Sequence, residues 1–164
     1  MSLTYKEGII SLSKEDLNII GRNPNSFEVF LFEVDKKDMR VRKIHRLDIY
    51  DPAISRFNPA IEKYGSAVFV YNPSDDSFFV SPAYNAKNPI KVGGKIIQGS
   101  SKLGHNEIIE IGSTTFYYTS PVVDRLSKEM LNKLYQAKSR DERIKIIREF
   151  DEKYQKILEQ QKSY

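Results

Sequence analysis

The chain has no cysteine and no tryptophan, and it has only two histidines, His45 and His105. The lack of cysteine excludes a disulfide framework, a thiolate metal site and a cysteine nucleophile. Two histidines are too few for a histidine-rich metal centre. We therefore expect no metal and no cofactor, and a chain without cysteine fits the reducing cytoplasm.

Long hydrophobic runs are also missing. No stretch approaches the roughly 20 apolar residues of a membrane-spanning helix, and the N-terminus lacks the apolar core of a signal peptide. Neither sign of charge dominates, because the net charge is only +4 and basic residues alternate with acidic ones. We expect no membrane contact, and a weakly basic surface permits an anionic partner without requiring one. The 164 residues suffice for one well-buried domain with a small appendage.

Short apolar stretches separated by turn formers fill residues 5–118. Within residues 88–118, Gly93-Gly94 joins two apolar strands and supplies the positive φ angles that a tight hairpin needs. A second hairpin follows, with Ile109 and Ile111 alternating with a polar residue as in a strand with one buried face. This spacing predicts a mainly β fold, a sandwich of two antiparallel sheets over residues 5–118.

An arginine-rich strand is predicted in the first half of the chain. The aromatic segment 27–35 and the segment 39–47 form a hairpin, in which Arg40, Arg42 and Arg46 fall on one face. Such a face is either a solvated strand surface or a site for an anion such as a nucleic acid. A further strand is predicted for residues 60–64.

After residue 118 the apolar period changes from that of a strand to that of a helix. Ser120 and Pro121 form an N-cap and first-turn pair, and Ser139 with Glu142 has the spacing of a capping box. Residues 119–164 are therefore predicted to be a C-terminal α-helical hairpin. We expect its apolar stripe to be buried on the sandwich or between two copies of the chain, which would make a homo-oligomer. The stripe comprises Leu126, Met130, Leu134, Ile147, Tyr154 and Ile157.

Several short motifs occur in the order found in forkhead-associated (FHA) domains. That family carries Gly-Arg after a strand, then Ser-Arg-x-His, an Asn-Gly, a Val-Asn-Gly and a final Leu-x-x-Gly-Asp-x-Ile-x-(Ile/Leu)-Gly. The chain resembles the family over residues 5–118. The resemblance implies a sandwich with its binding loops at one end, and recognition of phosphothreonine peptides without catalysis. The matching segments are Ile19-Ile20-Gly21-Arg22, Ile54-Ser55-Arg56 with Asn58, Asn88 ahead of Val92-Gly93-Gly94, and Leu103 through Gly112.

The resemblance also implies a role for each residue of the site. Arg22 would be the bidentate phosphate donor, Ser55 a hydroxyl donor and Arg56 an additional positive charge. Asn88 would hold the peptide backbone, with Lys87 beside it. Asn58, which stands where the family has histidine, would brace the loop that carries the serine.

The chain departs from the family pattern in two ways that affect these roles. Arg22 and Ser55 are further apart in sequence than in the family, so the hairpin between them would be an insertion. If it is not, Arg42 or Arg46 would be the phosphate arginine instead. Pro89 replaces the glycine of the Asn-Gly pair and pushes the preceding Asn88 toward an extended conformation.

The sequence thus predicts a phosphothreonine-peptide recognition module that binds a phosphorylated protein. One alternative is a degenerate FHA-like scaffold that binds its partner independently of phosphate, through the helical hairpin. A second is a nucleic-acid binder that uses the arginine face, although most aromatic side chains are expected in the core rather than on a stacking surface. An enzyme has the least support, since no carboxylate pair, glycine-rich phosphate loop or metal motif stands out.

Overall fold

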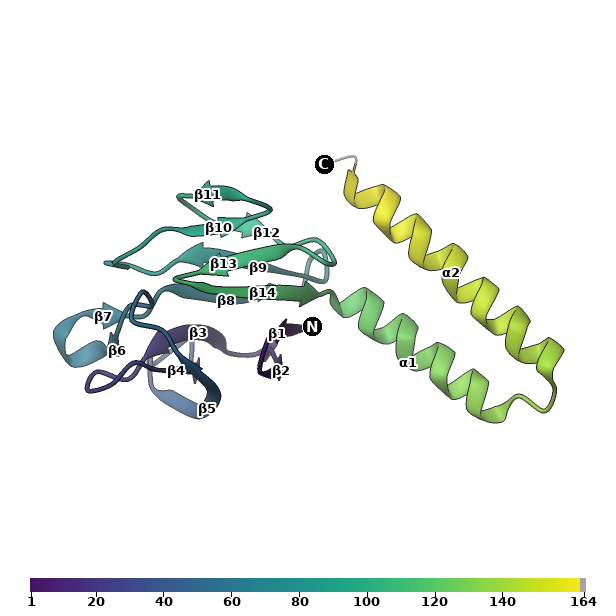
Figure 1. Cartoon of the computed structure of the whole chain (residues 1–164), viewed down its shortest axis with the longest axis horizontal. Helices are drawn as coiled ribbons and strands as arrows, with labels where there is room; N and C mark the ends of the chain where they lie inside the picture. The colour runs from purple at the N-terminus through teal and green to yellow at the C-terminus, as the bar shows by residue number, and fades with distance from the viewer. Residues whose placement is uncertain (163–164) are drawn as a thin grey trace.

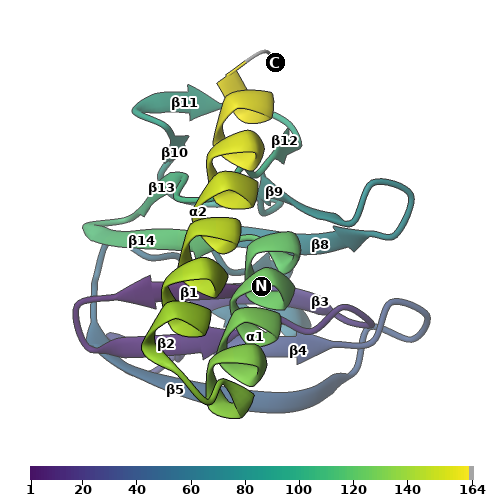
Figure 2. The same cartoon turned by 90° about the vertical axis from the view of Figure 1, so that its right-hand side faces the viewer.

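The computed structural model describes residues 1–162 of the 164-residue chain. Within them the protein is mainly β, with two large antiparallel sheets stacked on each other and two helices at the C-terminal end (Figures 1 and 2). The predicted fold class is therefore confirmed. Neither helix is long and apolar enough to span a membrane within this part of the chain.

The first sheet contains both hairpins predicted around residues 88–118. Gly93 and Gly94 have φ angles of 59° and 82°, as their turn requires. The sheet also begins earlier than residue 5, because Leu3 is fully buried and pairs with Tyr118 on the neighbouring strand. In spatial order its strands are β11 (Lys95–Ile97), β10 (Ile90–Val92), β13 (Ile108–Ile111), β14 (Thr114–Thr119), β1 (Ser2–Tyr5) and β2 (Gly8–Ser11).

The second sheet contains the predicted arginine-rich strand at one edge. That strand, β5, pairs only with β4 in the described chain, and its arginine side chains are exposed. The other edge is a two-residue strand. In spatial order the sheet consists of β12 (Ser101–Lys102), β9 (Ser77–Pro82), β8 (Ala67–Asn72), β3 (Leu17–Arg22), β4 (Glu28–Val34) and β5 (Val41–Tyr50).

The main core lies between the two sheets. Phe69 and Phe78 from the second sheet and Phe116 and Tyr118 from the first are all completely buried there. Filling this layer with aromatic side chains stabilises the sandwich, since each buries a large apolar area. The core also fixes the strand ends, from which the loops of the site emerge.

A small hairpin, here called the flap, spans residues 57–64 and covers part of the outer face of the second sheet. It comprises β6 (Phe57–Asn58), a 3-10 turn η1 (Pro59–Ile61) and β7 (Lys63–Tyr64). The Phe57 ring stacks on Phe32 of β4, with ring centroids 4.2 Å apart. The strand predicted over residues 60–64 is therefore formed only at Lys63–Tyr64, because Pro59 starts a helical turn that Glu62 ends with a φ of 56°.

Two helices form the predicted hairpin, α1 (Pro121–Gln136) and α2 (Arg140–Lys162). The Ser120 side chain accepts a hydrogen bond from the Val123 N–H, which confirms the N-cap. The capping box at the second helix is only half formed. Ser139 accepts the N–H of Glu142, but the Glu142 carboxylate accepts from Lys138 rather than from Ser139.

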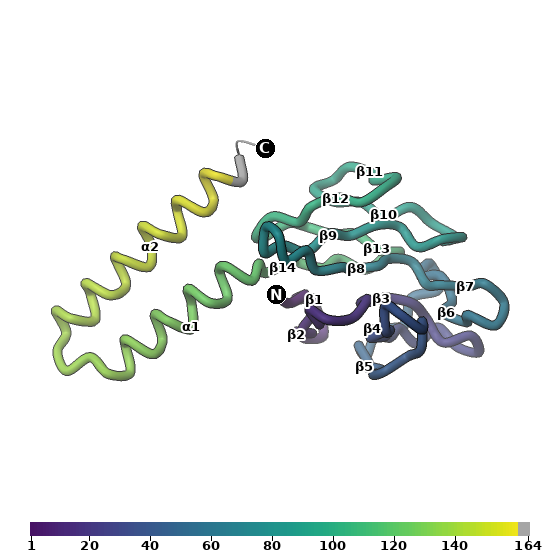
Figure 3. Tube along the Cα trace, turned by 180° about the vertical axis from the view of Figure 1, so that it is seen from behind, coloured from purple at the N-terminus to yellow at the C-terminus, as the bar shows by residue number. Residues whose placement is uncertain are grey.

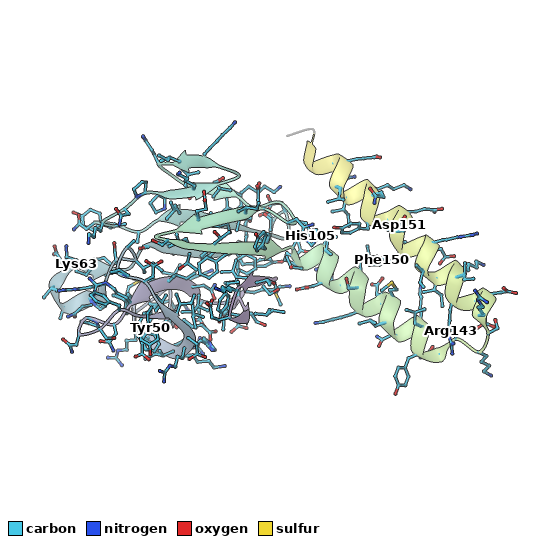
Figure 4. The ribbon with its side chains drawn as sticks, in the orientation of Figure 1. Tyr50, Lys63, His105, Arg143, Phe150 and Asp151 are labelled. Carbon is cyan, nitrogen blue, oxygen red and sulfur yellow. The ribbon has the colours of Figure 1, made fainter. Side chains whose placement is uncertain are left out.

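The apolar stripe of the hairpin is not buried on the sandwich. Ile147 is 50% exposed, and the other five stripe residues are half-buried because each helix covers the other on one side only. Phe150 lies between the two helices (Figure 4), where Ile146 is also half-buried. Tyr154 makes the contact with the sandwich, accepting a 3.2 Å hydrogen bond from Asn106.

Candidate functional site

The predicted site residues gather at the end of the sandwich that carries the flap, opposite the helices (Figure 1). Three loops meet beside the flap: residues 23–27 after β3, residues 51–56 after β5 and residues 83–89 after β9. The Arg22 N–H donates to the Ser55 carbonyl at 3.0 Å, and Arg22 pairs with Arg56 as an isolated parallel bridge. Hydrogen bonds thus join segments that are 32 residues apart in sequence.

Ser55 is held from two sides and is only 6% exposed. Its hydroxyl oxygen accepts the N–H of Lys87 at 2.6 Å, and its own N–H donates to the Ser66 hydroxyl at 2.8 Å. The Ser55 hydroxyl accepts the hydrogen bond from Lys87 through an oxygen lone pair. Its O–H hydrogen is not used in that bond and remains available to a ligand. The serine is therefore a rigidly placed donor.

Ser66 fastens the loops to each other, although the sequence did not point to it. It is fully buried; its N–H donates to the Ile20 carbonyl at 2.8 Å and its carbonyl accepts the N–H of Ala83 at 3.0 Å. Ser66 thus has the bracing position that was predicted for Asn58. Asn58 itself is half-buried in β6, and its side chain does not cap the following helical turn.

Two glycines allow the chain after the flap to run against β3. A Cβ atom on Gly21 would lie 3.0 Å from the Cα of Gly65 and 2.9 Å from the Cβ of Phe57. Gly65 has a φ of 82°, and a Cβ there would lie 2.6 Å from the Ile20 carbonyl oxygen. The Gly-Arg motif therefore serves close backbone packing as well as placing the arginine.

Arg22 is more deeply engaged than the sequence suggested. The side chain is 8% exposed, and it donates from Nε to the Ile54 carbonyl at 2.9 Å and from Nη1 to the Ser26 carbonyl at 3.2 Å. Its guanidinium also lies over the Phe27 ring, 5.3 Å from the centroid. A guanidinium has five N–H donors, so both terminal nitrogens keep N–H groups for a ligand. Arg22 is thus a loop-organising residue and not a freely presented fork.

Positive charge at this end is not balanced by carboxylates. Burial, and then the neighbouring Arg56 guanidinium, lower the pKa of Arg22. Arg56 and Lys87 are both exposed. Among the described residues, neither these two nor Arg22 forms an ion pair with a carboxylate. The cluster therefore has the electrostatics of an anion site.

Asn88 and Asp51 secure the loop that precedes Ser55. The Asn88 side chain donates to the Ala53 carbonyl at 2.8 Å, so part of the amide predicted to hold a peptide is already used within the protein. The Asp51 carboxylate is buried and accepts from the N–H groups of Ala53 and Ser113 and from the Thr114 hydroxyl, at 2.7–3.0 Å. Asp51 therefore links the start of its own loop to the turn after β13.

The alternative phosphate arginines, Arg42 and Arg46, are engaged elsewhere. Arg42 contacts Asp16 at 3.1 Å, and Arg46 pairs with Glu28 and with Asp48. Asp16 raises the pKa of Arg42 above its ordinary value. The pKa of Arg46 is raised first by the hydrogen bond that its guanidinium donates to Tyr50, and then by Glu28. The structure thus brings Arg22, and neither of these two, to Ser55.

A cleft of about 660 Å³ lies at the other end of the sandwich, between the loop at residues 102–107 and α2. His105 lies at this end and Lys63 of the flap at the opposite one (Figure 4). No group of three or more histidine or acidic side chains in the described part of the chain is arranged to hold a metal ion.

Comparisons with known proteins concern the fold. No family model and no curated protein matches the chain. Solved structures do match it, and two of them each show 18% identity over 73% of this chain and 95% of the other. One is the FHA domain of the CT664 protein from Chlamydia trachomatis, with a TM-score of 0.43. The other is the MEK1 FHA domain in complex with the HOP1 phosphothreonine peptide, with a TM-score of 0.44.

The chain resembles FHA domains. This is the family to which its sequence motifs had pointed. The candidate site of this chain rests on its own geometry, in which the segments that carry Arg22, Ser55, Arg56, Lys87 and Asn88 meet and Ser66 hydrogen-bonds to Ser55.

Proposed function

We propose that the chain is a phosphothreonine-peptide recognition module that mediates protein–protein interaction. The FHA-like sandwich of residues 5–118, with the residues of β1 before it, would bind the peptide, and residues 119–164 would be a helical extension. The observation that carries the proposal is the buried Arg22 beside Arg56, with no carboxylate partner among the described residues. A desolvated charge without a partner is costly, and a bound anion would offset that cost.

A phosphate dianion fits the donors that this end of the sandwich offers. Arg56 supplies an exposed guanidinium, Arg22 its remaining terminal N–H groups, and Ser55 the hydrogen of its hydroxyl. Charge-assisted hydrogen bonds of this kind are the strong ones in phosphate recognition. Asn88 would hold the peptide backbone through its side-chain oxygen, since one amide N–H is already bonded to Ala53.

The surroundings of Ser55 support binding without catalysis. Its hydroxyl bonds to a backbone N–H, and no histidine or carboxylate is hydrogen-bonded to it in the described chain. A serine nucleophile needs such a base to take its proton. We therefore propose a binding role for this residue.

The helical hairpin favours one second candidate, phosphate-independent binding of a partner. Tyr135 is 95% exposed, and Leu131 and Ile147 on the two helices are also exposed. Exposed apolar side chains on facing helices suit another helix or a second copy of the chain. A nucleic-acid role is disfavoured, because Arg42 and Arg46 are already neutralised by carboxylates.

A phosphothreonine peptide library tests the main proposal on the full chain. We expect binding that phosphatase treatment removes, and at least tenfold weaker binding for Arg56→Ala, since losing a charge-assisted hydrogen bond costs about 1.5–3 kcal/mol. Arg40→Ala is the matched control, because Arg40 is also exposed but lies next to β5. A library without any phosphate-dependent ligand would refute the proposal and leave the hairpin as the binding element.

A further inference from the structure

The helical hairpin has more apolar surface than its two helices can bury on each other. α1 and α2 meet along one seam, which includes Met130 on the first helix and Ile146 and Phe150 on the second. Each of these side chains is only half-buried. A seam between two helices needs a narrow apolar stripe, whereas a helix inside a bundle carries an apolar face at least about 100° wide. The width of the apolar face therefore indicates how many neighbours each helix requires.

Both helices carry apolar residues well beyond the seam. Leu131 lies about 100° round α1 from Met130, and Ile147 lies about 100° round α2 from Ile146. The two helices run antiparallel and face each other, so rotation in the same sense leads to the same side of the hairpin (Figure 1). The apolar side chains on this side are between 38% and 95% exposed. We call this side the tip face, and it consists of Leu131, Tyr135, Ile144 and Ile147.

The opposite side of the hairpin is charged. The side chains that flank the seam there are Glu129, Lys133, Glu149 and Lys153, and all four are exposed. A hairpin with one charged side and one apolar side is built to pack through the apolar side. The missing element is a second layer over the tip face, with one further neighbour for α1 and one for α2.

We propose that the tip face is the interface of a homodimer, in which the hairpins of two copies form a four-helix bundle. A second copy supplies the missing layer, because its own tip face presents two antiparallel helices with the same wide apolar arc. Two-fold dimers are the commonest assemblies of identical chains, and their interfaces are self-complementary. With the two tips side by side, α1 of one copy packs antiparallel to α2 of the other, as in an up-and-down bundle.

Charges beside the tip face suit this arrangement. Lys128 and Asp151 are both exposed on this side of the hairpin, and neither forms an ion pair with a described residue. Glu129 and Glu149 flank the same stretch of the seam, so Lys128 and Asp151 lie at about the same level along the hairpin. In the dimer Lys128 of one copy therefore faces Asp151 of the other, and the two-fold axis forms this pair twice.

The shape of the chain leaves room for the second copy. The hairpin projects away from the sandwich (Figure 1). The four residues of the tip face belong to the half of the hairpin that lies next to the connection at residues 137–139. Two hairpins therefore need to touch only near their tips, and their bases can diverge so that the sandwiches stay apart. Such a dimer carries two copies of the candidate phosphate site.

Sedimentation velocity of the full chain over a concentration series tests the dimer. We expect a species with twice the mass of one chain. Leu131→Glu and Ile147→Glu each place a carboxylate in the interface twice, so each raises the dissociation constant of the dimer at least about tenfold. Val122→Glu is the matched control, because Val122 is also an exposed apolar residue of α1 but lies beside Arg125 and Glu129 on the charged side. Far-UV circular dichroism checks that each variant keeps its helices.

Exchanging two charges tests how the hairpins are arranged. Lys128→Asp and Asp151→Lys each weaken the dimer about two- to fivefold, and the double variant restores it. A chain that stays monomeric at every concentration overturns the proposal, and so does a dimer that Leu131→Glu and Ile147→Glu leave intact. A double variant as weak as the single ones overturns the pairing of α1 with α2 across the dimer. Phosphopeptide binding is measured separately, so these outcomes are independent of the proposed function.

Discussion

The N–H of Ser55 donates a hydrogen bond to the hydroxyl of Ser66 at 2.8 Å, and both residues are buried. The flap, residues 57–64, lies between them in sequence. This bond therefore closes the flap at its base and fixes the serine proposed to bind phosphate. We expect Ser66→Ala to lower the free energy of unfolding by about 1–3 kcal/mol, because it leaves a buried N–H without its acceptor.

Urea unfolding measures that loss, and phosphopeptide titration should show weaker binding by the same variant. Ser74→Ala is the control, because Ser74 is an exposed serine in the loop between β8 and β9. Equal stabilities of the two variants would show that Ser66 does not brace the site.

Arg22 and Arg56 should differ in their effect on stability. Truncating Arg22 to alanine removes donors to the carbonyls of Ile54 and Ser26, so we expect a loss of about 1.5–3 kcal/mol. Arg56 is exposed, and Arg56→Ala should change stability by less than about 0.5 kcal/mol. Denaturant unfolding of both variants checks this difference. If both unfold like the wild type, the buried hydrogen bonds of Arg22 contribute little.

Gly65 is expected to resist substitution more strongly than Gly94, although both have a φ of 82°. An alanine at either position costs about 1–2 kcal/mol for the left-handed backbone. At Gly65 the added Cβ would also lie 2.6 Å from the Ile20 carbonyl oxygen, whereas at Gly94 it would meet nothing within 4 Å. The difference between the two thermal unfolding midpoints isolates the steric contribution. Equal midpoints would mean that the flap moves away without cost.

His105 should make the protein less stable in mild acid. Burial, and then the positive N-terminal amine of Met1, lower the pKa of His105 below its ordinary value of 6.5. The unfolded chain therefore takes up a proton before the folded chain does, and stability falls as the pH drops below about 6.5. Above that pH the contribution is fully present.

His105→Gln isolates this contribution. Glutamine keeps an acceptor for the Ser120 N–H, which His105 Nδ1 accepts at 3.3 Å, but it does not titrate. Unfolding free energies of the two proteins between pH 7.5 and about 5 should therefore diverge in favour of the variant as the pH falls. Parallel profiles would show that His105 titrates alike in the folded and unfolded states.

Sequence patterns that act locally predicted most of the fold. The turn at Gly93-Gly94 and the cap at Ser120 depend on a few adjacent residues, so their residue types alone indicated the structure. The stripe of the helical hairpin is not buried on the sandwich, because periodicity shows which face is apolar but not what covers it. Its burial between two copies of the chain stays a prediction.

The order of motifs predicted which segments would meet, and Arg22 and Lys87 do contact Ser55. The binding roles of these residues stay predictions, and the bonding among them was not predicted. The burial of Arg22 was not predicted, because its hydrogen-bond partners are backbone carbonyls. Every residue has a backbone carbonyl, so residue types do not indicate these partners. Ser66 was missed because the flap separates it from Ser55. A signal did exist, since Gly65-Ser66 directly precedes the buried strand β8.

The helices leave the sandwich after β14, whereas β6 and β7 of the flap lie at the opposite end of the sandwich (Figure 3). An occupant of one end therefore does not obstruct the other, and one copy of the chain can bridge two molecules. Where both binding segments belong to one partner, the second contact becomes intramolecular once the first is made, with an effective concentration that reaches about millimolar for short tethers. Weak contacts at each end would then combine into a long-lived assembly that dissociates when the phosphate is removed.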